Sequence, residues 1–470
     1  MKFGTSGLRG LATDLLGPQT ALYTRAFAAR LFETRTARPG DSVFVGRDLR
    51  DSSPRIAALC ADALTADSLN VVDCGELPTP ALAGFALAHR SAALMVTGSH
   101  IPADRNGIKF FLADGEIGKA DEAAITAWVE ADAPAEKPAA HAGAVTDRHA
   151  EALDWYWRRG RAMTTEGALS GMRVGVYEHS SVARDFLREM LESLGAIVVS
   201  LGRTNHFVAV DTEAVPQETI ATFGAWAATH RLDAIVSTDG DGDRPLIADE
   251  TGAQLRGDII GLITARMVGA TVVVTPVTSN SGIHAGLGFD VVRTRVGSPF
   301  VIEAMQAAAG SGGTITGFEA NGGFLLGSSF DHDGIGGTAL PTRDALLPIL
   351  AVLQSARREG LSLSALSAHW ALPVCVSDRL EDFAVERSRA LMAHLGTGDE
   401  ALKRFVSPLG TVATIDRTDG LRATLSSGEI VHLRPSGNAP EMRCYTEAAT
   451  SERAQTLNAG ALDLVRQWQA

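Results

Sequence analysis

Short apolar runs alternate with segments of helical periodicity through the first three quarters of the chain. In the first unit, such runs and periodic segments follow one another at residues 42–48, 53–68, 70–75, 79–90 and 92–100. A short apolar run bounded by polar residues is typical of a buried strand, and the longer periodic segments predict helices. Strands that alternate with helices predict a mostly parallel sheet covered by helices.

The same alternation occurs twice more. The second unit has predicted strands at 172–180, 196–202 and 232–244 and a helix at 181–195. The third has strands at 271–279, 290–298 and 313–324 and helices at 298–310 and 342–360. In each unit a strand runs directly into a polar or glycine-rich loop. Ligand sites in such folds lie at the carboxyl ends of strands, so we expect these loops to form one composite site.

The last hundred residues follow a different pattern. Residues 411–448 alternate apolar and polar positions like antiparallel strands, and a final helix is expected to begin with Ser451 as its N-cap. We therefore predict an α/β protein with three related α/β domains with mixed sheets plus a C-terminal α+β domain around a central cleft. The predicted domains are residues 1–145, 146–254, 255–366 and 367–470, with linkers near 133–145 and 361–369.

The composition narrows the class of protein. A formal net charge of −13 argues against general nucleic-acid binding, which needs a basic face, but it permits a local basic pocket for an anion. We find neither a signal-peptide pattern nor an apolar stretch long enough to span a membrane, so we expect a cytoplasmic protein without a membrane partner. Without a Cys-x-x-Cys pair, four buried, reduced thiols are expected at Cys60, Cys74, Cys375 and Cys444.

Three aspartates follow the last predicted strand of the second unit. Alternate positions in an extended loop let Asp239, Asp241 and Asp243 converge, and three hard oxygen donors suit Mg²⁺ or Ca²⁺. An EF-hand has acidic residues at the same spacing, with Glu250 in its last position, but Arg244 stands where that loop needs glycine. An arginine beside a metal site instead indicates a shared anionic ligand such as a phosphoryl group.

Two other loops have the composition of anion-binding sites. Residues 434–443 combine arginine forks, which match phosphate oxygens, with hydroxyl, amide and backbone N–H groups that suit an anion nest: Arg434, Ser436, Gly437, Asn438 and Arg443. Near the N-terminus, a glycine-rich stretch contains Thr5, Ser6 and Arg9 but lacks the Lys-Ser/Thr pair of a nucleotide-binding P-loop. Taken alone, each loop is also compatible with a plain polar turn.

Two strand ends have other candidate chemistry. Glu319 and Asn321 combine a carboxylate with an amide, which suits vicinal sugar hydroxyls, and a plain polar turn fits this loop equally well when it is taken alone. Ser99, His100 and Lys109 lie within eleven residues, and a surface turn or a hydrolase nucleophile both fit that loop taken alone. A Ser-His-Asp hydrolase is disfavoured because the Gly-x-Ser-x-Gly elbow is missing and His100 is poorly placed as a base for its neighbour.

Five motifs together resemble those of the α-D-phosphohexomutase superfamily. They are FGTSGLRG, TGSHIPADRNGIKF, DGDGDR, FEANGG and RPSGNAPEMR, which begin at residues 3, 97, 239, 318 and 434. Each motif alone is weak evidence for this superfamily, but five motifs in the same order and at compatible intervals are specific. The resemblance covers nearly the whole chain. The resemblance implies a Mg²⁺-dependent isomerase that moves a phosphoryl group between C6 and C1 of a hexose. A hexose 1,6-bisphosphate would be both its intermediate and its activator.

The resemblance also implies roles for matching residues. Ser99 would be the phosphoserine that donates and recovers the phosphoryl group, and it would bind Mg²⁺ together with Asp239, Asp241 and Asp243. Arg9, Lys109 and Arg244 would flank the transferred group, and Lys109 or His100 would assist proton transfer. The phosphosugar would be bound by Thr5, Ser6, Glu319, Asn321, Arg434, Ser436, Gly437, Asn438 and Arg443.

The sugar loop departs from the family pattern Glu-x-Ser-Gly-His. Asn321 replaces the serine and Gly323 the histidine, while Asn438 stands where threonine is common in the phosphate loop. The motifs are most similar to those of bacterial members that interconvert mannose 6-phosphate and mannose 1-phosphate. Action on glucose or glucosamine phosphates is the alternative, and a non-catalytic sugar-phosphate-binding protein is a remote one. We expect a monomer or a homodimer.

Overall fold

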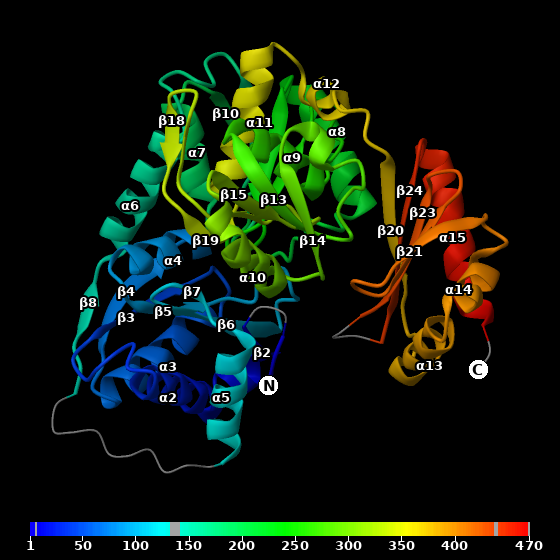
Figure 1. Ribbon diagram of the computed structural model, residues 1–470. Coiled ribbons are helices and arrows are strands. Elements are labelled where there is room, and N and C mark those ends of the chain that lie inside the picture. Colours follow the sequence, from blue (N-terminus) through cyan, green and yellow to red (C-terminus); the bar gives the residue numbers. More distant parts are fainter. Residues whose placement is uncertain (5–6, 132–141, 437–439, 469–470) are drawn as a thin grey trace. The chain divides into compact units, whose positions relative to one another are not determined.

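The computed structural model describes residues 1–4, 7–131, 142–436 and 440–468 (Figure 1). The chain forms two compact units. Unit 1 contains residues Met1–Val272 and Met305–Ser367, and unit 2 contains Val273–Ala304 and Ala368–Ala470.

Unit 1 begins with an eight-stranded mixed sheet. Its strands are β1 (Lys2–Phe3), β2 (Leu8–Leu11), β3 (Ser42–Arg47), β4 (Asn70–Glu76), β5 (Ala92–Val96), β6 (Arg105–Leu112), β7 (Gly115–Glu116) and β8 (Val145–Asp147). The order is β1-β2-β6-β5-β3-β4-β8, and β7 pairs with β6. β3 is parallel to β4 and β5, whereas β6 is antiparallel to β5, so the sheet is mixed as predicted.

Helices cover both faces of this sheet. Figure 1 shows α2 (Pro18–Glu33), α3 (Ser53–Ala66) and α5 (Lys119–Glu130) below it and α4 (Thr79–Ala88) above it; the short α1 (Ala12–Leu15) follows β2. Apolar residues of the lower helices and of the strands, such as Phe27, Leu64 and Phe110, form one core. Every residue of α4 from Thr79 to Ala86 is buried. This agrees with its sequence, since a helix that is apolar on all sides has no face for solvent.

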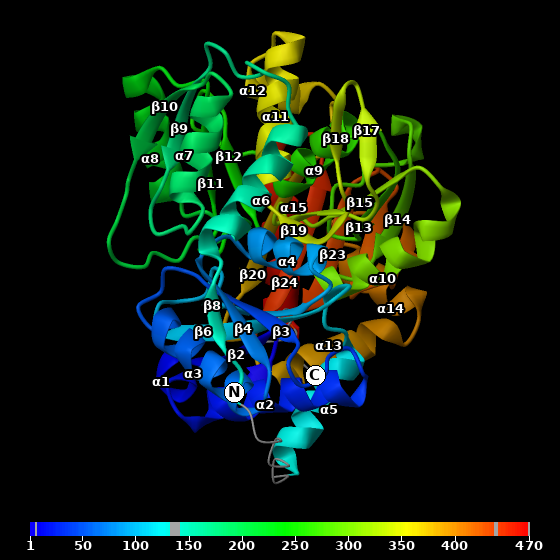
Figure 2. The same cartoon turned by 90° about the vertical axis from the view of Figure 1, so that its left-hand side faces the viewer.

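The second sheet of unit 1 carries the aspartate loop. Its order is β10 (Ile197–Leu201), β9 (Arg173–Tyr177), β11 (Ala234–Thr238) and β12 (Pro245–Ala248). The first three strands are parallel, and β12 returns antiparallel to β11, so residues 239–244 form a hairpin loop. The accompanying helices α6 (His149–Ala162), α7 (Arg184–Ser193) and α8 (Gln217–His230) are seen best in Figure 2.

The third part of unit 1 holds the predicted sugar loop. The antiparallel strands β15 (Thr314–Phe318), β16 (Phe324–Leu326) and β19 (Leu340–Asp344) pair in that order. The hairpin of β17 (Phe330–His332) and β18 (Ile335–Gly337) lies between β16 and β19 in the sequence. This part also contains α9 (Gly257–Met267), the 3-10 helix η2 (Ala309–Ser311), α11 (Leu346–Glu359) and α12 (Leu363–Ala368), which lies in the predicted second linker.

The predicted start of the helix at residue 342 was wrong. Residues Leu340–Asp344 form β19, and α11 begins only at Leu346. Pairing of Asp344 with Phe324 and of Leu340 with Leu326 supplies backbone hydrogen bonds that outweigh the helical pattern of the sequence.

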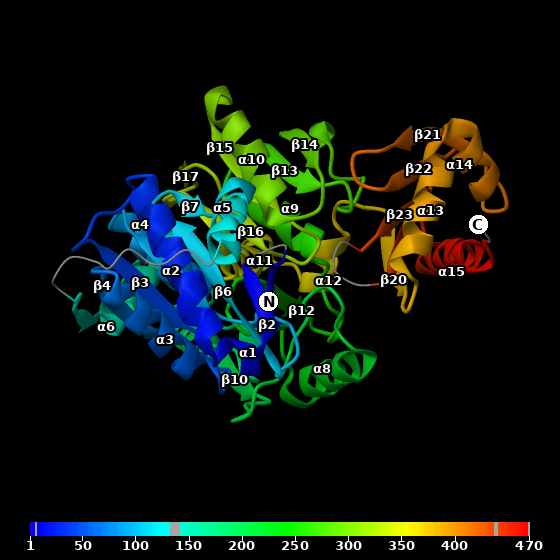
Figure 3. The same cartoon turned by 90° about the horizontal axis from the view of Figure 1, so that it is seen from below.

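Unit 2 has α+β structure, as predicted for the C-terminal domain. Its antiparallel sheet has the order β20 (Val374–Leu380), β24 (Met442–Ala448), β23 (Ile430–Pro435), β22 (Leu421–Leu425) and β21 (Val412–Asp416). Figure 3 shows α13 (Val385–Gly396), α14 (Asp399–Val406) and α15 (Ser451–Gln467) beside this sheet. The predicted cap of the last helix is displaced by one residue, because the Thr450 side chain accepts the N–H of Arg453.

The remaining elements of unit 2 come from the third quarter of the chain. They are β14 (Asp290–Thr294), most of β13 (Ala270–Pro276), the 3-10 helix η1 (Ala285–Leu287) and the start of α10 (Ser298–Ala308). The α/β fold class with a C-terminal α+β domain is thus confirmed, while the domain boundaries and the central cleft stay predictions; β8 lies across the boundary predicted at residue 145.

The cysteines and the possible membrane-spanning segments were also the subject of predictions. All four cysteines have free thiols, as predicted, but only three of them are buried, and the expected burial of Cys375 was wrong because its side chain is partly exposed. Within the described ranges, we find no helix with the length and apolar character that crossing a membrane requires.

Candidate active site

Ser99 lies just beyond the carboxyl end of β5 and is buried, with a φ of +52°. Non-glycine residues rarely adopt this left-handed conformation and keep it only where the surroundings enforce it. The Ser99 N–H donates to Thr97 Oγ1 at 2.8 Å, and the Thr97 hydroxyl donates to Asp48 Oδ2 at 2.7 Å. The loop therefore holds the Ser99 hydroxyl in a defined position.

The buried guanidinium of Arg50 holds the same loop from within. It donates hydrogen bonds of 2.6–3.0 Å to four backbone carbonyl oxygens, those of Ser99, Ile101, Pro102 and Arg105. Asp48 Oδ2 lies 3.3 Å from Nε, and the Phe207 ring centre lies 3.8 Å from Cζ. Gly98 allows this approach, because a Cβ there would lie 2.4 Å from Arg50 Cζ.

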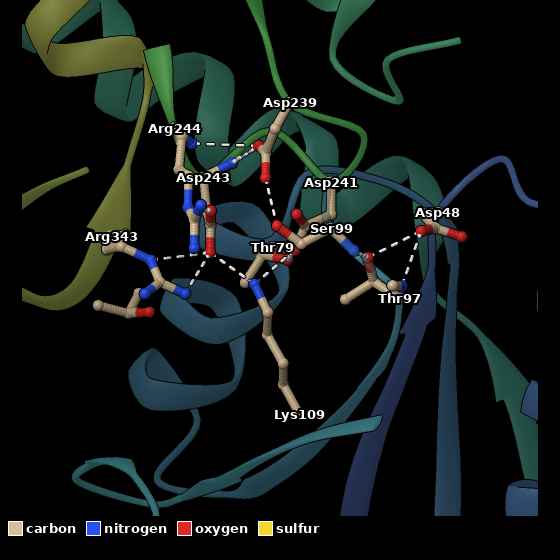
Figure 4. A network of polar contacts seen from close by, with 12 residues as sticks. Asp48, Thr79, Thr97, Ser99, Lys109, Asp239, Asp241, Asp243, Arg244 and Arg343 are labelled. Atoms are coloured by element: carbon tan, nitrogen blue, oxygen red, sulfur yellow. Dashed lines mark hydrogen bonds and ion pairs between the residues drawn. The ribbon is translucent and has the colours of Figure 1, made fainter. Parts of the chain in front are cut away.

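The aspartate loop places three buried carboxylates beside Ser99 (Figure 4). One oxygen of each carboxylate lies within 4.8 Å of the others, as the sequence predicted. The Ser99 hydroxyl donates to Asp239 Oδ2 at 2.5 Å. Loops from the first and second sheets, 140 residues apart in the sequence, thus meet at one hydroxyl group.

Lys109 on β6 lies against the same cluster. Its Nζ donates to Asp241 Oδ2 at 2.6 Å and to Asp243 Oδ2 at 2.5 Å. Thr79 also donates to Asp241 Oδ2, at 2.5 Å. Among the described residues, Oδ1 of both aspartates is buried without a hydrogen-bond partner. Three clustered carboxylates with unused oxygens fit a hard divalent cation such as Mg²⁺.

The cluster divides its charge unevenly. Burial and the neighbouring charges of Asp241 and Asp243 raise the pKa of Asp239 well above its usual value. Burial opposes ionisation of Asp243 too, but Arg343 and Lys109 outweigh it and hold its pKa below the usual value. For Asp241, attraction to Lys109 likewise outweighs burial and lowers the pKa. The cluster is thus largely anionic and depends on nearby cations.

His100 contacts the Ser99 hydroxyl directly, while Arg244 contacts His100 and Arg9 contacts the backbone of the same loop. Nδ1 of His100 lies 3.3 Å from Ser99 Oγ and 3.1 Å from Arg244 Nη1. The charge of Arg244, together with burial, lowers the pKa of His100 to about 3, so its imidazole is neutral. Arg9 on β2 donates to the Thr97 carbonyl at 3.4 Å, and burial lowers its pKa to about 10. Ser99 and the four other predicted catalytic residues thus all lie in unit 1.

The predicted sugar loop is a tight turn between β15 and β16. The N–H of Glu319 donates to the Gly323 carbonyl at 3.1 Å, and Asn321 Oδ1 accepts the Gly323 N–H at 2.9 Å. Glu319 is buried, and its Oε2 lies 3.6 Å from Arg343 Nη1. The Asn321 amide oxygen therefore shapes the turn, whereas the Glu319 carboxylate is held by a cation that also contacts Asp243.

The predicted phosphate loop belongs to unit 2. Arg434 donates to Asp419 Oδ2 at 2.9 Å, and the Ser436 N–H donates to the Glu441 carbonyl at 2.9 Å. Arg443 lies on β24 opposite Arg434, with Nη2 3.6 Å from Glu441 Oε2. Two arginines thus sit side by side on paired strands. The predicted residues Thr5, Ser6, Gly437 and Asn438 lie outside the described ranges.

Sequence reasoning missed four residues of the site: Asp48, Arg50, Thr79 and Arg343. Asp48 and Arg50 follow β3, so the rule that sites form at strand ends was a usable signal for them. Thr79 begins α4, where the sequence pattern predicted a helix and no site residue. Arg343 was hidden because its segment was assigned to a helix.

Comparison with protein families matches the chain to four consecutive domain models. These are the phosphoglucomutase/phosphomannomutase α/β/α domains I (residues 1–136), II (159–252) and III (256–372) and the C-terminal domain (379–464). Together they cover most of the chain in the order expected from the five motifs.

Individual relatives extend over the full length. A phosphomannomutase of Sinorhizobium fredii is 52% identical over 465 residues, 98% of both chains. A phosphomannomutase of Salmonella muenchen is 42% identical over 97% of this chain and 93% of its own. The crystal structure of a putative phosphomannomutase from Thermus thermophilus superposes with a TM-score of 0.76 at 25% identity and covers 99% of each chain.

Proposed function

The chain belongs to the phosphoglucomutase/phosphomannomutase family, and from that premise we propose that it interconverts mannose 6-phosphate and mannose 1-phosphate through a phosphoserine at Ser99. The observation that carries this proposal is the buried Ser99 hydroxyl, 2.5 Å from a carboxylate of the aspartate cluster. The full-length relatives support mannose as the sugar.

In the proposed cycle, the phosphoryl group passes from Ser99 Oγ to the free hydroxyl of a hexose monophosphate. The P–O bond to Oγ breaks, a P–O bond to the sugar oxygen forms, and the hydroxyl proton ends on Oγ. The product is a hexose 1,6-bisphosphate. Transfer of its other phosphoryl group back to Ser99 releases the isomeric monophosphate. Free bisphosphate acts as activator because it phosphorylates Ser99.

Phosphoryl transfer depends on positioning and on charge neutralisation. A phosphoserine carries about −1.5 to −2 charges at neutral pH, so it needs cations around it. A divalent cation held by Asp239, Asp241 and Asp243 would neutralise part of the charge on the phosphoryl oxygens. Lys109, Arg244 and Arg9 supply the remaining fixed positive charge from three strands or strand ends around Ser99.

The contacts favour different roles for Lys109 and His100. Nζ of Lys109 is engaged by two carboxylates, which suits a fixed charge rather than a proton carrier. Nδ1 of His100 lies 3.3 Å from Ser99 Oγ, so we assign proton transfer to His100 on this proximity alone. Its lowered pKa of about 3 makes it a weak base in the unphosphorylated protein.

Substrate binding is assigned to three loops in the proposal. Glu319 and Asn321 select the sugar hydroxyls, and Thr5 and Ser6 are further substrate-binding residues. Arg434, Ser436, Gly437, Asn438 and Arg443 bind the phosphate that does not react, because arginine forks match phosphate oxygens.

A substrate comparison tests this function. Turnover of mannose, glucose and glucosamine 1-phosphates is measured in a coupled assay with Mg²⁺ and a hexose 1,6-bisphosphate. We expect the highest kcat/KM for mannose 1-phosphate. A preference for glucosamine 1-phosphate would contradict the assigned sugar, and no turnover of any substrate would indicate a protein that only binds sugar phosphates.

A further inference from the structure

The guanidinium of Arg343 lies between the aspartate loop and the sugar loop. Its side chain is 2% exposed, and Nε and Nη2 donate to Asp243 Oδ2 at 3.1 and 2.9 Å. Nη1 lies 3.6 Å from Glu319 Oε2. One planar fork thus contacts a carboxylate of the candidate metal site and a carboxylate of the candidate sugar site (Figure 4 labels Arg343 beside Asp243).

Arg343 orients Asp243 in a particular way. Together with Lys109, it occupies Oδ2 of this aspartate, so that Oδ1 is left without a hydrogen bond within the part of the chain that the structure describes. Nε and Nη2 of the planar fork converge on this one oxygen, a contact whose direction is set by the guanidinium plane and which the flexible ammonium of a lysine does not reproduce. Groups that orient a metal ligand in this manner commonly change metal affinity when they are replaced.

Arg343 also compensates the charge of Glu319. The Oε2 atom of Glu319 is buried, and at 3.6 Å the guanidinium is too far away to form a hydrogen bond with it. Within the described residues, Oε2 has no hydrogen-bond partner, so it retains its capacity to accept a sugar hydroxyl. The Glu319 carboxylate thus lies beside the Arg343 cation, while its Oε2 atom can still accept a hydrogen bond.

The path of the Arg343 side chain explains a glycine in the sugar loop. A Cβ at Gly323 would lie 2.5 Å from Arg343 Cδ and 3.0 Å from Cγ. Neither carbon can move far while the guanidinium stays on Asp243. The position where the family pattern has histidine is therefore glycine here, because the methylene groups of Arg343 fill the adjoining space.

We propose that Arg343 is a positioning residue that couples the two loops, so that one side chain sets both divalent-cation affinity and sugar-phosphate binding. The proposal rests on the proposed function for the identity of the sugar site. It extends that function by making Arg343 and Gly323 an interdependent pair.

The test uses Arg343→Lys, which keeps the charge but loses the fork. Calorimetric titrations of the dephosphorylated protein with Mg²⁺ alone and with mannose 1-phosphate alone are compared with those of the unsubstituted protein. We expect both affinities to fall, that for Mg²⁺ by roughly tenfold or more. Glu319→Gln should weaken only sugar-phosphate binding.

Arg159→Lys is the matched control. Arg159 is also buried, bonds Thr338 at 2.6 Å and has Nε 3.8 Å from Asp344, the neighbour of Arg343. We expect the substitution to lower the melting temperature while both affinities stay unchanged. Unchanged Mg²⁺ affinity in Arg343→Lys, or loss of only one of the two affinities, overturns the proposal. Absence of mutase turnover in the unsubstituted protein would overturn the proposed function alone, since both titrations still decide the role of Arg343.

A second pair of variants keeps the test decisive if Arg343→Lys does not fold. Gly323→Ala should weaken both affinities because its Cβ displaces the Arg343 methylenes. In an Arg343→Ala background, which lacks Cγ and Cδ, the same glycine substitution should have a much smaller effect, since of the three closest contacts of the added Cβ only that with Asn321 Oδ1, at 3.1 Å, then remains. Independent, multiplicative losses from the two substitutions would contradict the interdependence that we infer.

Discussion

Replacement of Arg50 by methionine tests whether the Ser99 loop depends on a buried guanidinium. The substitution keeps most of the side-chain volume but removes four hydrogen bonds to the carbonyls of residues 99–105. It also leaves Asp48 without the cation that lies 3.3 Å away. The loop would lose the hydrogen bonds that fix its backbone from inside, and Ser99 would no longer be held at its positive φ.

The magnitude follows from these contacts. A hydrogen bond from a charged donor contributes about 1.5–3 kcal/mol, and such contributions are not additive within one network. Removal of one partner of a buried ion pair costs about 3–5 kcal/mol, because the other charge stays buried. We therefore expect Arg50→Met to destabilise unit 1 by about 3–5 kcal/mol, with a smaller loss in Arg50→Lys. If the loop shifts by about 1 Å, kcat falls on the order of 100-fold.

Thermal unfolding and the coupled mutase assay measure the two effects. The expected loss corresponds to a fall in melting temperature of roughly 5–15 °C. Arg25→Met is the matched control, because Arg25 forms a two-point contact with Asp67 in the same domain but is one third exposed. We expect a loss of less than about 1 kcal/mol for this more exposed pair. An Arg50→Met protein with an unchanged melting temperature and full activity would refute the reasoning.

Three further predictions follow from the cluster and from buried histidines. Lys109→Met should abolish most turnover, and added Mg²⁺ should raise its melting temperature more than that of the unsubstituted protein, because Asp241 and Asp243 lose their internal cation; an equal or smaller increase would contradict this. Asp241→Asn should raise the Mg²⁺ concentration for half-maximal activity by roughly tenfold or more, measured at saturating substrate; an unchanged concentration would exclude it as a ligand. Burial lowers the pKa of His432 to about 4, below its unfolded value, so its contribution is present above about pH 6.5 and is lost as pH falls toward 4. Thermal unfolding between these pH values should therefore show a steeper loss in the unsubstituted protein than in His432→Gln, and equal slopes would count against it.

Most strands and helices of the α/β part were predictable because local pattern and tertiary environment agree. The β-rich run at 42–48 forms β3, and the apolar run before the aspartates forms β11. Where they disagree, pairing decides the structure. Residues 342–344 continue a helical pattern but form part of β19, since β16 offers an open edge.

The candidate site was predictable in its anionic part and less so in its cationic part. The aspartate triplet and Ser99 are local motifs, and each follows a buried strand. Arg50 and Arg343 act across 49 and 100 residues of sequence. The end of β3 marks Arg50 as a candidate, but no local spacing shows which groups either arginine contacts. Their roles arise only when folding buries them against particular carbonyls and carboxylates.

The central claim is that the phosphoryl group passes through Ser99. Its most direct test is a single-turnover reaction of the unphosphorylated protein with radiolabelled hexose 1,6-bisphosphate, followed by peptide mapping of the protein-bound label. The account predicts about one phosphate per chain on the peptide that contains Ser99, transferable to mannose 1-phosphate, and no labelling or turnover in Ser99→Ala. Label on another residue, or steady turnover in Ser99→Ala, would contradict it.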